Sequence, residues 1–386
     1  MPVPMEAVRR LLDLRHRGRA EDLPAVLTDA APLLGASAAS VLLVDYGQVS
    51  LCPLRGTDPV LTGPVLVDDT PAGQAFRTAR EVWDDGHYFV PLLHGAERLG
   101  VLDLETKAEP SPDDRDDLQV IAALLAELIA SRRFYGDAVE HTRRRMPMQL
   151  AAEIIWNQLP PLTFAVDGTV VTAVLEPCYD VGGDAFDYAA NGSVLHVALF
   201  DTVGHGISAS GLTTLTLNTY RNARRSGLSL ADTYKSIDKW IAARYKGSFV
   251  TAILAELDTD TGVYSRVNAG HPTELLLRDG QTLEPPPAPN ALPLGLGGML
   301  DRPPRTVSRQ LAPGDTLVLY TDGVTEARDA DGILFGRERL TRFLLDDLDR
   351  GTSPPEMMRH LIQAIVSYEN NDLRDDATAA MLRWRH

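Results

Sequence analysis

Apolar and polar residues along the first 110 positions alternate at both helical and strand spacing. Apolar residues recur every three or four positions in two early segments, and uninterrupted apolar runs follow them. The spacing predicts helices over 5–17, 22–34 and 71–80, and strands over 39–45, 88–95 and 97–106. Together these elements predict one small α+β domain.

A stretch rich in proline and acidic residues separates this domain from a helical segment. Ser111 is placed to cap a helix, Pro112 takes its first position, and apolar residues recur at helical spacing between Leu118 and Ile129. The helix is expected to continue beyond residue 132, with interruptions. Its apolar stripe either packs on its own domain or pairs with a second chain, and the second option predicts a homodimer through roughly 113–158.

From residue 165 onward the pattern is rich in strands. Apolar runs predict strands over 169–176, 193–201, 249–258, 262–268, 273–278, 315–320 and 377–384, and helical spacing predicts helices over 206–226, 229–245, 336–348 and 354–369. Turn sequences between neighbouring strands indicate antiparallel pairs, so sheet layers covered by helices are expected. The predicted organisation is a small α+β domain over 1–110, a helical linker over 111–160 and a second α+β domain over 161–386.

Charge and cysteine content narrow the classes of partner and compartment. With 37 basic and 53 acidic residues, the net charge of −16 argues against nucleic acid as the main partner. The two cysteines, Cys52 and Cys178, lack the spacing of a metal site and favour a reduced, cytoplasmic protein. No apolar stretch is long enough to span a bilayer, so no membrane segment is predicted.

Four aspartates lie at the borders of predicted apolar strands. They are Asp184 in a glycine turn, Asp201 and Asp322 at the ends of apolar runs, and Asp375 before the last strand. Each taken singly is typical of a turn. Four converging carboxylates would repel one another unless cations lay between them, so the set predicts a metal site. Ligands that are all oxygen favour Mg²⁺ or Mn²⁺.

The turn that follows Asp201 suggests how the chain approaches such a site. Gly204, His205 and Gly206 form a tight turn of small residues, which lets a backbone carbonyl come close enough to ligate. His205 and His271 are expected to support the site rather than to bind the metal. Two cations bridged by one carboxylate would turn a water into hydroxide near neutral pH, which can attack a phosphorus atom.

Six ordered motifs give the second half a family resemblance. They read "EPCYDVGGDAFDY", "FDTVGHGISAS", "FVTAILAELD", "VNAGHP", "LVLYTDGVTEARD" and "RDDATAAML". Over about 147–386 the chain resembles bacterial metal-dependent serine/threonine phosphatases of the PPM type, in the SpoIIE-like and RsbU-like branch. The resemblance implies a β-sandwich of two antiparallel sheets flanked by helices, two Mn²⁺ or Mg²⁺ ions, and hydrolysis of phosphoserine or phosphothreonine on a protein.

The resemblance also implies a role for each acid. Asp201 would bridge both metals, Asp184 and the carbonyl of Thr202 would complete one, and Asp322 and Asp375 would complete the other. Asp376 is the alternative to Asp375 if the register of the doublet is shifted. Residues expected to support these ligands are Gly183, Gly204, His205, Gly206, Asn268, His271 and Gly323. No arginine in the chain is assigned to the substrate phosphate.

The first half resembles a GAF sensor domain, which implies a possible small-molecule ligand. In relatives, a helix like "MQLAAEIIWNQLPPL" couples a sensor to assembly of the metal site. The family also implies a substrate, namely a phosphorylated anti-sigma-factor antagonist of the STAS type. The rival hypotheses are a GAF-gated scaffold whose phosphatase-like domain binds without catalysis and, more remotely, a metal-dependent nuclease or cyclase.

Overall fold

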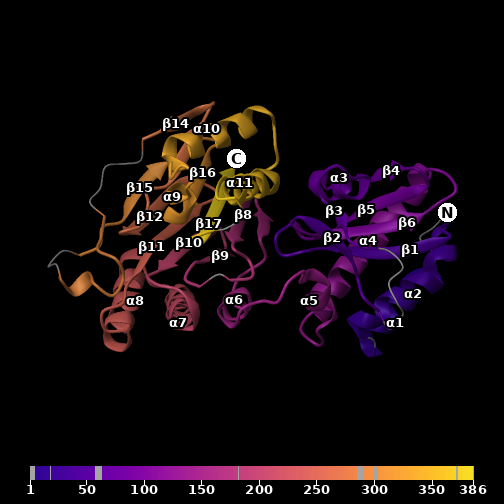
Figure 1. Cartoon of the computed structure of the whole chain (residues 1–386), viewed down its shortest axis with the longest axis horizontal. Coiled ribbons are helices and arrows are strands. Elements are labelled where there is room, and N and C mark those ends of the chain that lie inside the picture. The colour runs from indigo at the N-terminus through magenta and orange to yellow at the C-terminus, as the bar shows by residue number, and fades with distance from the viewer. Residues whose placement is uncertain are drawn as a thin grey trace. The chain divides into compact units, whose positions relative to one another are not determined.

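The computed structural model of the chain describes residues 5–17, 19–56, 63–180, 182–284, 290–299, 303–370 and 373–385. The chain divides into two compact units, Met1–Pro147 and Met148–His386 (Figure 1). Each unit has its own hydrophobic core. The two units are therefore described separately.

The first unit is built on a six-stranded antiparallel sheet with strand order β3-β2-β1-β6-β5-β4. Its elements are α1 (Met5–Arg17), α2 (Leu23–Ala30), β1 (Ala38–Val44), β2 (Ser50–Pro53), β3 (Val65–Leu66), α3 (Pro71–Thr78), β4 (Val82–Asp84), β5 (His87–His94), β6 (Glu97–Glu105), α4 (Pro112–Arg132) and α5 (Ala138–Arg143). All six predicted elements of this unit are present. The sequence analysis missed β2, β3 and β4, because strands of two to four residues are too short to show a period.

The apolar stripe of α4 belongs to the core of the first unit. Leu118, Ile121, Leu125 and Ile129 are all buried there together with residues of α1, α2 and the sheet. This burial corrects the predicted linker over 111–160, because α4 and α5 fold with the first unit and the division falls after Pro147. It also removes the apolar face on which the predicted homodimer rested.

The helix predicted to continue beyond residue 132 with interruptions is divided into separate helices. Helix α4 ends at Arg132, the short α5 follows separately, and α6 (Leu150–Trp156) begins the second unit. Ala152 and Ile155 of α6 pack against Leu175. The second unit is thus longer at its start than the predicted 161–386.

The second unit contains two antiparallel sheets of five and six strands, with strand orders β15-β12-β11-β10-β9 and β14-β13-β16-β17-β8-β7. The strands are β7 (Thr163–Val166), β8 (Thr169–Glu176), β9 (Ala185–Asn191), β10 (Val194–Thr202), β11 (Val250–Asp258), β12 (Val263–Ala269), β13 (Leu275–Arg278), β14 (Gln281–Leu283), β15 (Val307–Gln310), β16 (Thr316–Tyr320) and β17 (Ala377–Trp384). The helices are α7 (Gly206–Arg225), α8 (Leu230–Arg244), α9 (Asp322–Glu326), α10 (Gly336–Asp349) and α11 (Pro354–Tyr368). The predicted fold, two antiparallel sheets flanked by helices, is confirmed.

Strand β10 shows why the central strands read as continuous apolar runs. Val197 and Leu199 lie in the core between the two sheets, whereas Ala198 and Phe200 lie in the core beneath α7 and α8 (Figure 1). Both faces of the strand are buried, so polar residues do not alternate with apolar ones. Because side chains alternate along a strand, Asp201 continues the face of Val197 and Leu199, toward the second sheet.

Candidate metal centre

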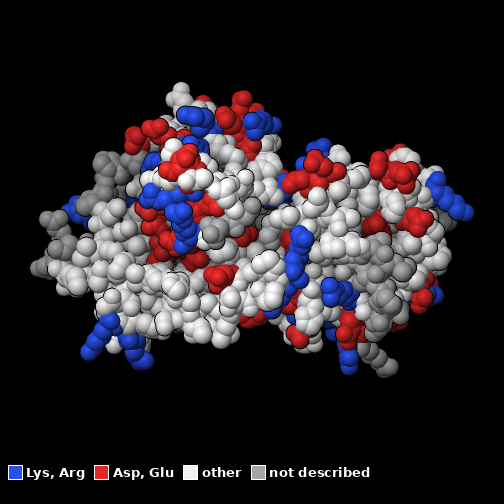
Figure 2. All heavy atoms as spheres, in the orientation of Figure 1, with Lys and Arg blue, Asp and Glu red and all other residues white. Residues whose placement is uncertain are grey.

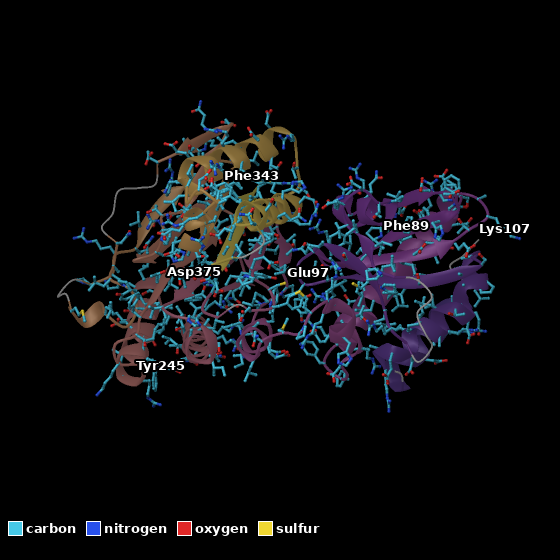
Figure 3. All side chains as sticks on the ribbon, in the orientation of Figure 1. Phe89, Glu97, Lys107, Tyr245, Phe343 and Asp375 are labelled. Atoms are coloured by element: carbon cyan, nitrogen blue, oxygen red, sulfur yellow. The ribbon has the colours of Figure 1, made fainter. Side chains whose placement is uncertain are left out.

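Five aspartates meet around one cavity in the second unit. The cavity has a volume of about 640 Å³ and is lined by Pro177, Asp180, Asp201, Thr202, Val203, Gly204, His205, Gly206, Phe249, Thr251, Asp322, Leu373, Arg374, Asp375 and Asp376. Asp375, labelled in Figure 3, comes from the segment just before β17. The lining thus unites five separate parts of the chain, including three of the four aspartates that the sequence singled out.

The fourth predicted aspartate, Asp184, lies behind the cavity wall. Its side chain is buried, and its Oδ2 accepts a hydrogen bond from the Thr321 hydroxyl at 2.8 Å. The charges of Asp201 and Asp376 both act on it, so all four predicted carboxylates belong to one electrostatic cluster. Asp322 lies two residues beyond the predicted strand end, because β16 stops at Tyr320 and Asp322 opens helix α9.

Two glycines allow the loops that carry these acids to touch. A Cβ on Gly183 would stand 2.6 Å from the carbonyl oxygen of Thr202, and one on Gly323 would stand 2.1 Å from that of Asp376. Both distances are too short for any side chain. The two glycines that the sequence analysis placed beside the ligands are therefore required by close approach of the backbone.

The turn after β10 contains two glycines in backbone conformations that favour glycine, as its sequence predicted. Gly204 and Gly206 have φ angles of +90° and +75°, which other residues rarely adopt. His205 between them is exposed, lines the cavity and precedes the first turn of α7. The turn brings the start of α7 to the cavity immediately after Asp201.

Asp376 is held differently from Asp375. Its Oδ2 accepts hydrogen bonds from the backbone N–H groups of Gly182, Gly183 and Asp184 at 2.9, 2.7 and 3.2 Å. Asp375 is exposed at the cavity, and its Oδ1 accepts only the N–H of the next residue among the hydrogen bonds recorded for it. The arrangement favours Asp375 as the residue that faces a metal and Asp376 as the residue that fixes the loop carrying Asp184.

A short chain of hydrogen bonds orients Asp201. Thr251, its partner across the β10–β11 pair, donates from its hydroxyl to Oδ2 of Asp201 at 3.3 Å. The same hydroxyl lies 2.7 Å from Nδ1 of His271. Asn268 fixes the turn by accepting from the N–H of His271 and donating to its carbonyl. Burial lowers the pKa of His271 to about 3, so its ring is neutral and supports the site instead of adding charge.

The aspartates of the cluster have raised pKa values, which means that simultaneous ionisation of all of them is unfavourable. Burial raises the pKa of Asp184 well above its usual value, and the charges of Asp201 and Asp376 raise it further. Burial raises the pKa of Asp201 to about 7, with Asp322 and Asp375 contributing next. Burial and then Asp375 raise the pKa of Asp322 as well. When these carboxylates are ionised, their negative charges repel one another, and divalent cations would supply the positive charge that balances them.

The donor set fits Mg²⁺ or Mn²⁺, since the converging groups are carboxylates with backbone carbonyls beside them. In the described ranges, no group of three or more His, Cys, Asp or Glu side chains is positioned to bind a single metal ion. Hard cations that keep several waters need fewer protein ligands than that. The assignment of individual ligands, including the carbonyl of Thr202, therefore stays a prediction.

Several residues of the site were missed by the sequence analysis. Thr213 of α7 is fully buried; its hydroxyl lies 2.8 Å from that of Thr202 and donates to the carbonyl of Gly183 at 2.8 Å. Thr321 and Thr251 bond the acids directly. Threonine is common inside strands and helices, so only the pairing of strands and the packing of α7 identify these three. Cys52 and Cys178 are both buried.

Comparison with known proteins identifies the family. The sequence profile of the family described as Stage II sporulation protein E (SpoIIE) matches residues 191–385, just over half of the chain. The chain belongs to the SpoIIE family. The SpoIIE match includes Asp201, Asp322 and Asp375, whereas Asp184 precedes it. None of the helices in the described ranges has the length and apolar composition that crossing a bilayer requires.

Among curated relatives, the chain is similar to the phosphoserine phosphatase RsbU of Bacillus subtilis (strain 168). The two are 23% identical over 214 residues, which cover 55% of this chain and 62% of RsbU. The chain thus spans less than two thirds of that relative's length.

Two solved structures are also similar to the SpoIIE-family chain. The RsbU and RsbW domains of Rv1364c from Mycobacterium tuberculosis share 23% identity with it at a TM-score of 0.49, over 56% of this chain and 60% of that one. The catalytic domain of the serine/threonine protein phosphatase PstP, in complex with two manganese ions, shares 15% identity at a TM-score of 0.39, over 56% of this chain and 100% of that one.

Proposed function

We propose that the second unit is a metal-dependent phosphatase that hydrolyses phosphoserine or phosphothreonine on a protein. The observation that carries the proposal is the convergence of Asp201, Asp322 and Asp375 on one cavity, with Asp184 buried behind them. Membership of the SpoIIE family supports it. So does the match to a relative named as a phosphoserine phosphatase.

In this proposal Asp201 would bridge two ions, Asp184 and the Thr202 carbonyl would complete one, and Asp322 and Asp375 the other. When bound, two divalent cations supply a water that ionises near neutral pH and positive charge toward the phosphoryl oxygens. The chain orients the ligands, since Thr251 donates to Asp201 and Thr321 donates to Asp184. The backbone N–H groups that hold Asp376 keep the loop of Asp184 in place.

Hydrolysis of p-nitrophenyl phosphate by the full chain tests the proposal. Release of p-nitrophenol with Mn²⁺ or Mg²⁺, and its loss with EDTA, is the expected result. No release under any metal condition would favour the rival function, a scaffold that binds a partner without catalysis. The complete set of acids around the cavity weighs against that rival.

Finer parts of the proposal concern the partners. The proposed substrate is a phosphorylated anti-sigma-factor antagonist of the STAS type. The first unit is a GAF-like sensor that regulates the activity of the phosphatase. The protein acts in the cytoplasm. Comparison of phosphoproteins in cells with the wild-type chain and with an Asp201→Asn chain tests the substrate. The apolar residues of α4 that suggested a homodimer are buried within the first unit. Light scattering of the full chain, which gives the mass of the particle in solution, tests whether it is a dimer.

A further inference from the structure

The cavity that gathers the aspartates also holds one cationic side chain. Arg374 is the single lysine or arginine among the described residues that line it, beside five aspartates. Its side chain is exposed. In the region where Figure 3 labels Asp375, Figure 2 shows basic atoms next to a group of acidic ones.

The backbone at Arg374 is fixed from the side of α11. Glu369, which caps the end of α11, is buried, and its Oε2 accepts the N–H of Arg374 at 3.0 Å. Its other oxygen, Oε1, accepts the N–H of Arg328 at 2.7 Å. One carboxylate therefore ties the segment before β17 to the segment after α9, and the position of Arg374 does not depend on its own side chain.

The same segment is fixed from its other side by Asp376. The three hydrogen bonds from Gly182, Gly183 and Asp184 to its Oδ2 hold the residue two positions after Arg374. Arg374 and Asp375 thus sit on a backbone anchored at both ends while their own side chains are exposed at the cavity. Such a placement fixes the backbone that carries both side chains, so binding of a ligand has to order only the side chains themselves.

We propose that Arg374 binds the phosphate group of the substrate. A guanidinium offers two parallel N–H groups that match a phosphate in both geometry and charge, which a lysine cannot reproduce. A phosphomonoester entering this cavity meets five aspartates, so a cation beside them offsets part of the repulsion that bound metals leave. This inference rests on the proposed function and names the residue that the sequence left unassigned.

Phosphate affinity of the full chain tests the inference independently of catalysis. Titration calorimetry with inorganic phosphate, at saturating Mg²⁺, is expected to show a Kd that Arg374→Ala weakens by about 10- to 100-fold, the range for loss of a hydrogen bond to a charged group. Arg374→Lys should retain part of the affinity. The KM for p-nitrophenyl phosphate should rise in parallel, with a smaller change in kcat.

Arg328→Ala is the matched control. Its backbone N–H is held by the same carboxylate as that of Arg374, but its guanidinium donates to the carbonyl of Gly332 at 3.2 Å, and Arg328 does not line the cavity. It should leave both the phosphate Kd and the KM unchanged. Unfolding temperatures of all three variants confirm that an exposed side chain was removed without loss of the fold.

Three results would overturn the inference. One is an unchanged phosphate Kd in Arg374→Ala, and another is no phosphate binding by the wild-type chain. The third is a shift in the Mg²⁺ concentration for half-saturation with phosphate affinity intact, because Arg374 would then only balance the carboxylates. A wild-type chain that binds phosphate through Arg374 yet hydrolyses no phosphoester would instead contradict the proposed function and leave this inference standing.

Discussion

The Oδ2 atom of Asp376 accepts a hydrogen bond from the backbone N–H of Gly183 at 2.7 Å, across 193 positions of sequence. This contact joins the loop before β9 to the segment before β17. The loop carries Asp184 and the segment carries Asp375, two of the predicted ligands. Assembly of the site thus depends on two distant parts of the second unit closing on each other.

Substitution of the two adjacent aspartates should separate structural and metal-binding roles. Asp376→Ala leaves three backbone N–H groups without their acceptor, so the free energy of unfolding in EDTA should fall by about 1–3 kcal/mol. Asp375→Ala removes an exposed side chain and should leave that free energy nearly unchanged while weakening the binding of Mg²⁺. Urea unfolding and metal titration measure the two effects, and equal destabilisation by both variants would contradict the distinction.

Gly183 and Gly211 should respond in opposite directions to the same change. Gly183→Ala places a methyl group against the Thr202 carbonyl and should cost about 1–3 kcal/mol of stability, with weaker metal binding. Gly211 lies inside α7, where a Cβ would make an ordinary 3.5 Å contact with the Tyr245 hydroxyl. Gly211→Ala should therefore stabilise the chain by about 0.5–1 kcal/mol. Thermal unfolding of both variants measures these changes. A Gly183→Ala variant with unchanged stability would contradict the close contact between Gly183 and the carbonyl of Thr202.

Asp201→Asn should abolish metal-dependent hydrolysis of p-nitrophenyl phosphate, by a factor on the order of 10³ or more, and leave the fold intact. The amide removes the charge that the proposed bridge between two cations requires. Asp232→Asn is the control, because Asp232 is exposed near the start of α8 and pairs with Lys235. Wild-type turnover by purified Asp201→Asn with Mn²⁺ would show that the metal assignment is wrong.

The pH dependence of stability should differ between the metal-free and metal-loaded chain. Burial raises the pKa of Asp201 to about 7 from 3.8, so the folded state holds this proton more tightly than the unfolded state does. The resulting stabilisation is complete below about pH 3.8 and is lost as the pH rises to about 7. Mg²⁺ compensates the ionised acids, so the gain in Tm on adding Mg²⁺ should grow between pH 5 and pH 8.

Asp201→Asn provides the control for this pH profile, since an amide does not titrate. The gain in Tm on adding Mg²⁺ should then be smaller and should vary less with pH. A gain that stays constant from pH 5 to pH 8 in the wild-type chain would show that ionisation of Asp201 is not linked to binding of the metal.

Local sequence patterns determined most elements of the fold. The strands over 169–176 and 377–384 and the helix over 5–17 match β8, β17 and α1 residue for residue, because long periodic runs bury one or both faces wherever they pack. The short strands β3 and β14 carry too few residues to show a period. The linker prediction was wrong because the same apolar spacing on a helix is expected for packing on its own unit and for packing on another chain. The stripe of α4 packs on its own unit.

The sequence by itself also predicted three of the acids that line the cavity, since Asp201, Asp322 and Asp375 stand at the ends or borders of buried strands. Only the tertiary structure decided how they are held. It showed that Asp376 accepts hydrogen bonds from backbone N–H groups whereas Asp375 is exposed at the cavity, and it brought Thr251 and Arg374 to the same place. The physical reason is that strand borders are local properties of sequence, whereas hydrogen bonds between loops nearly two hundred residues apart exist only once the two sheets have packed.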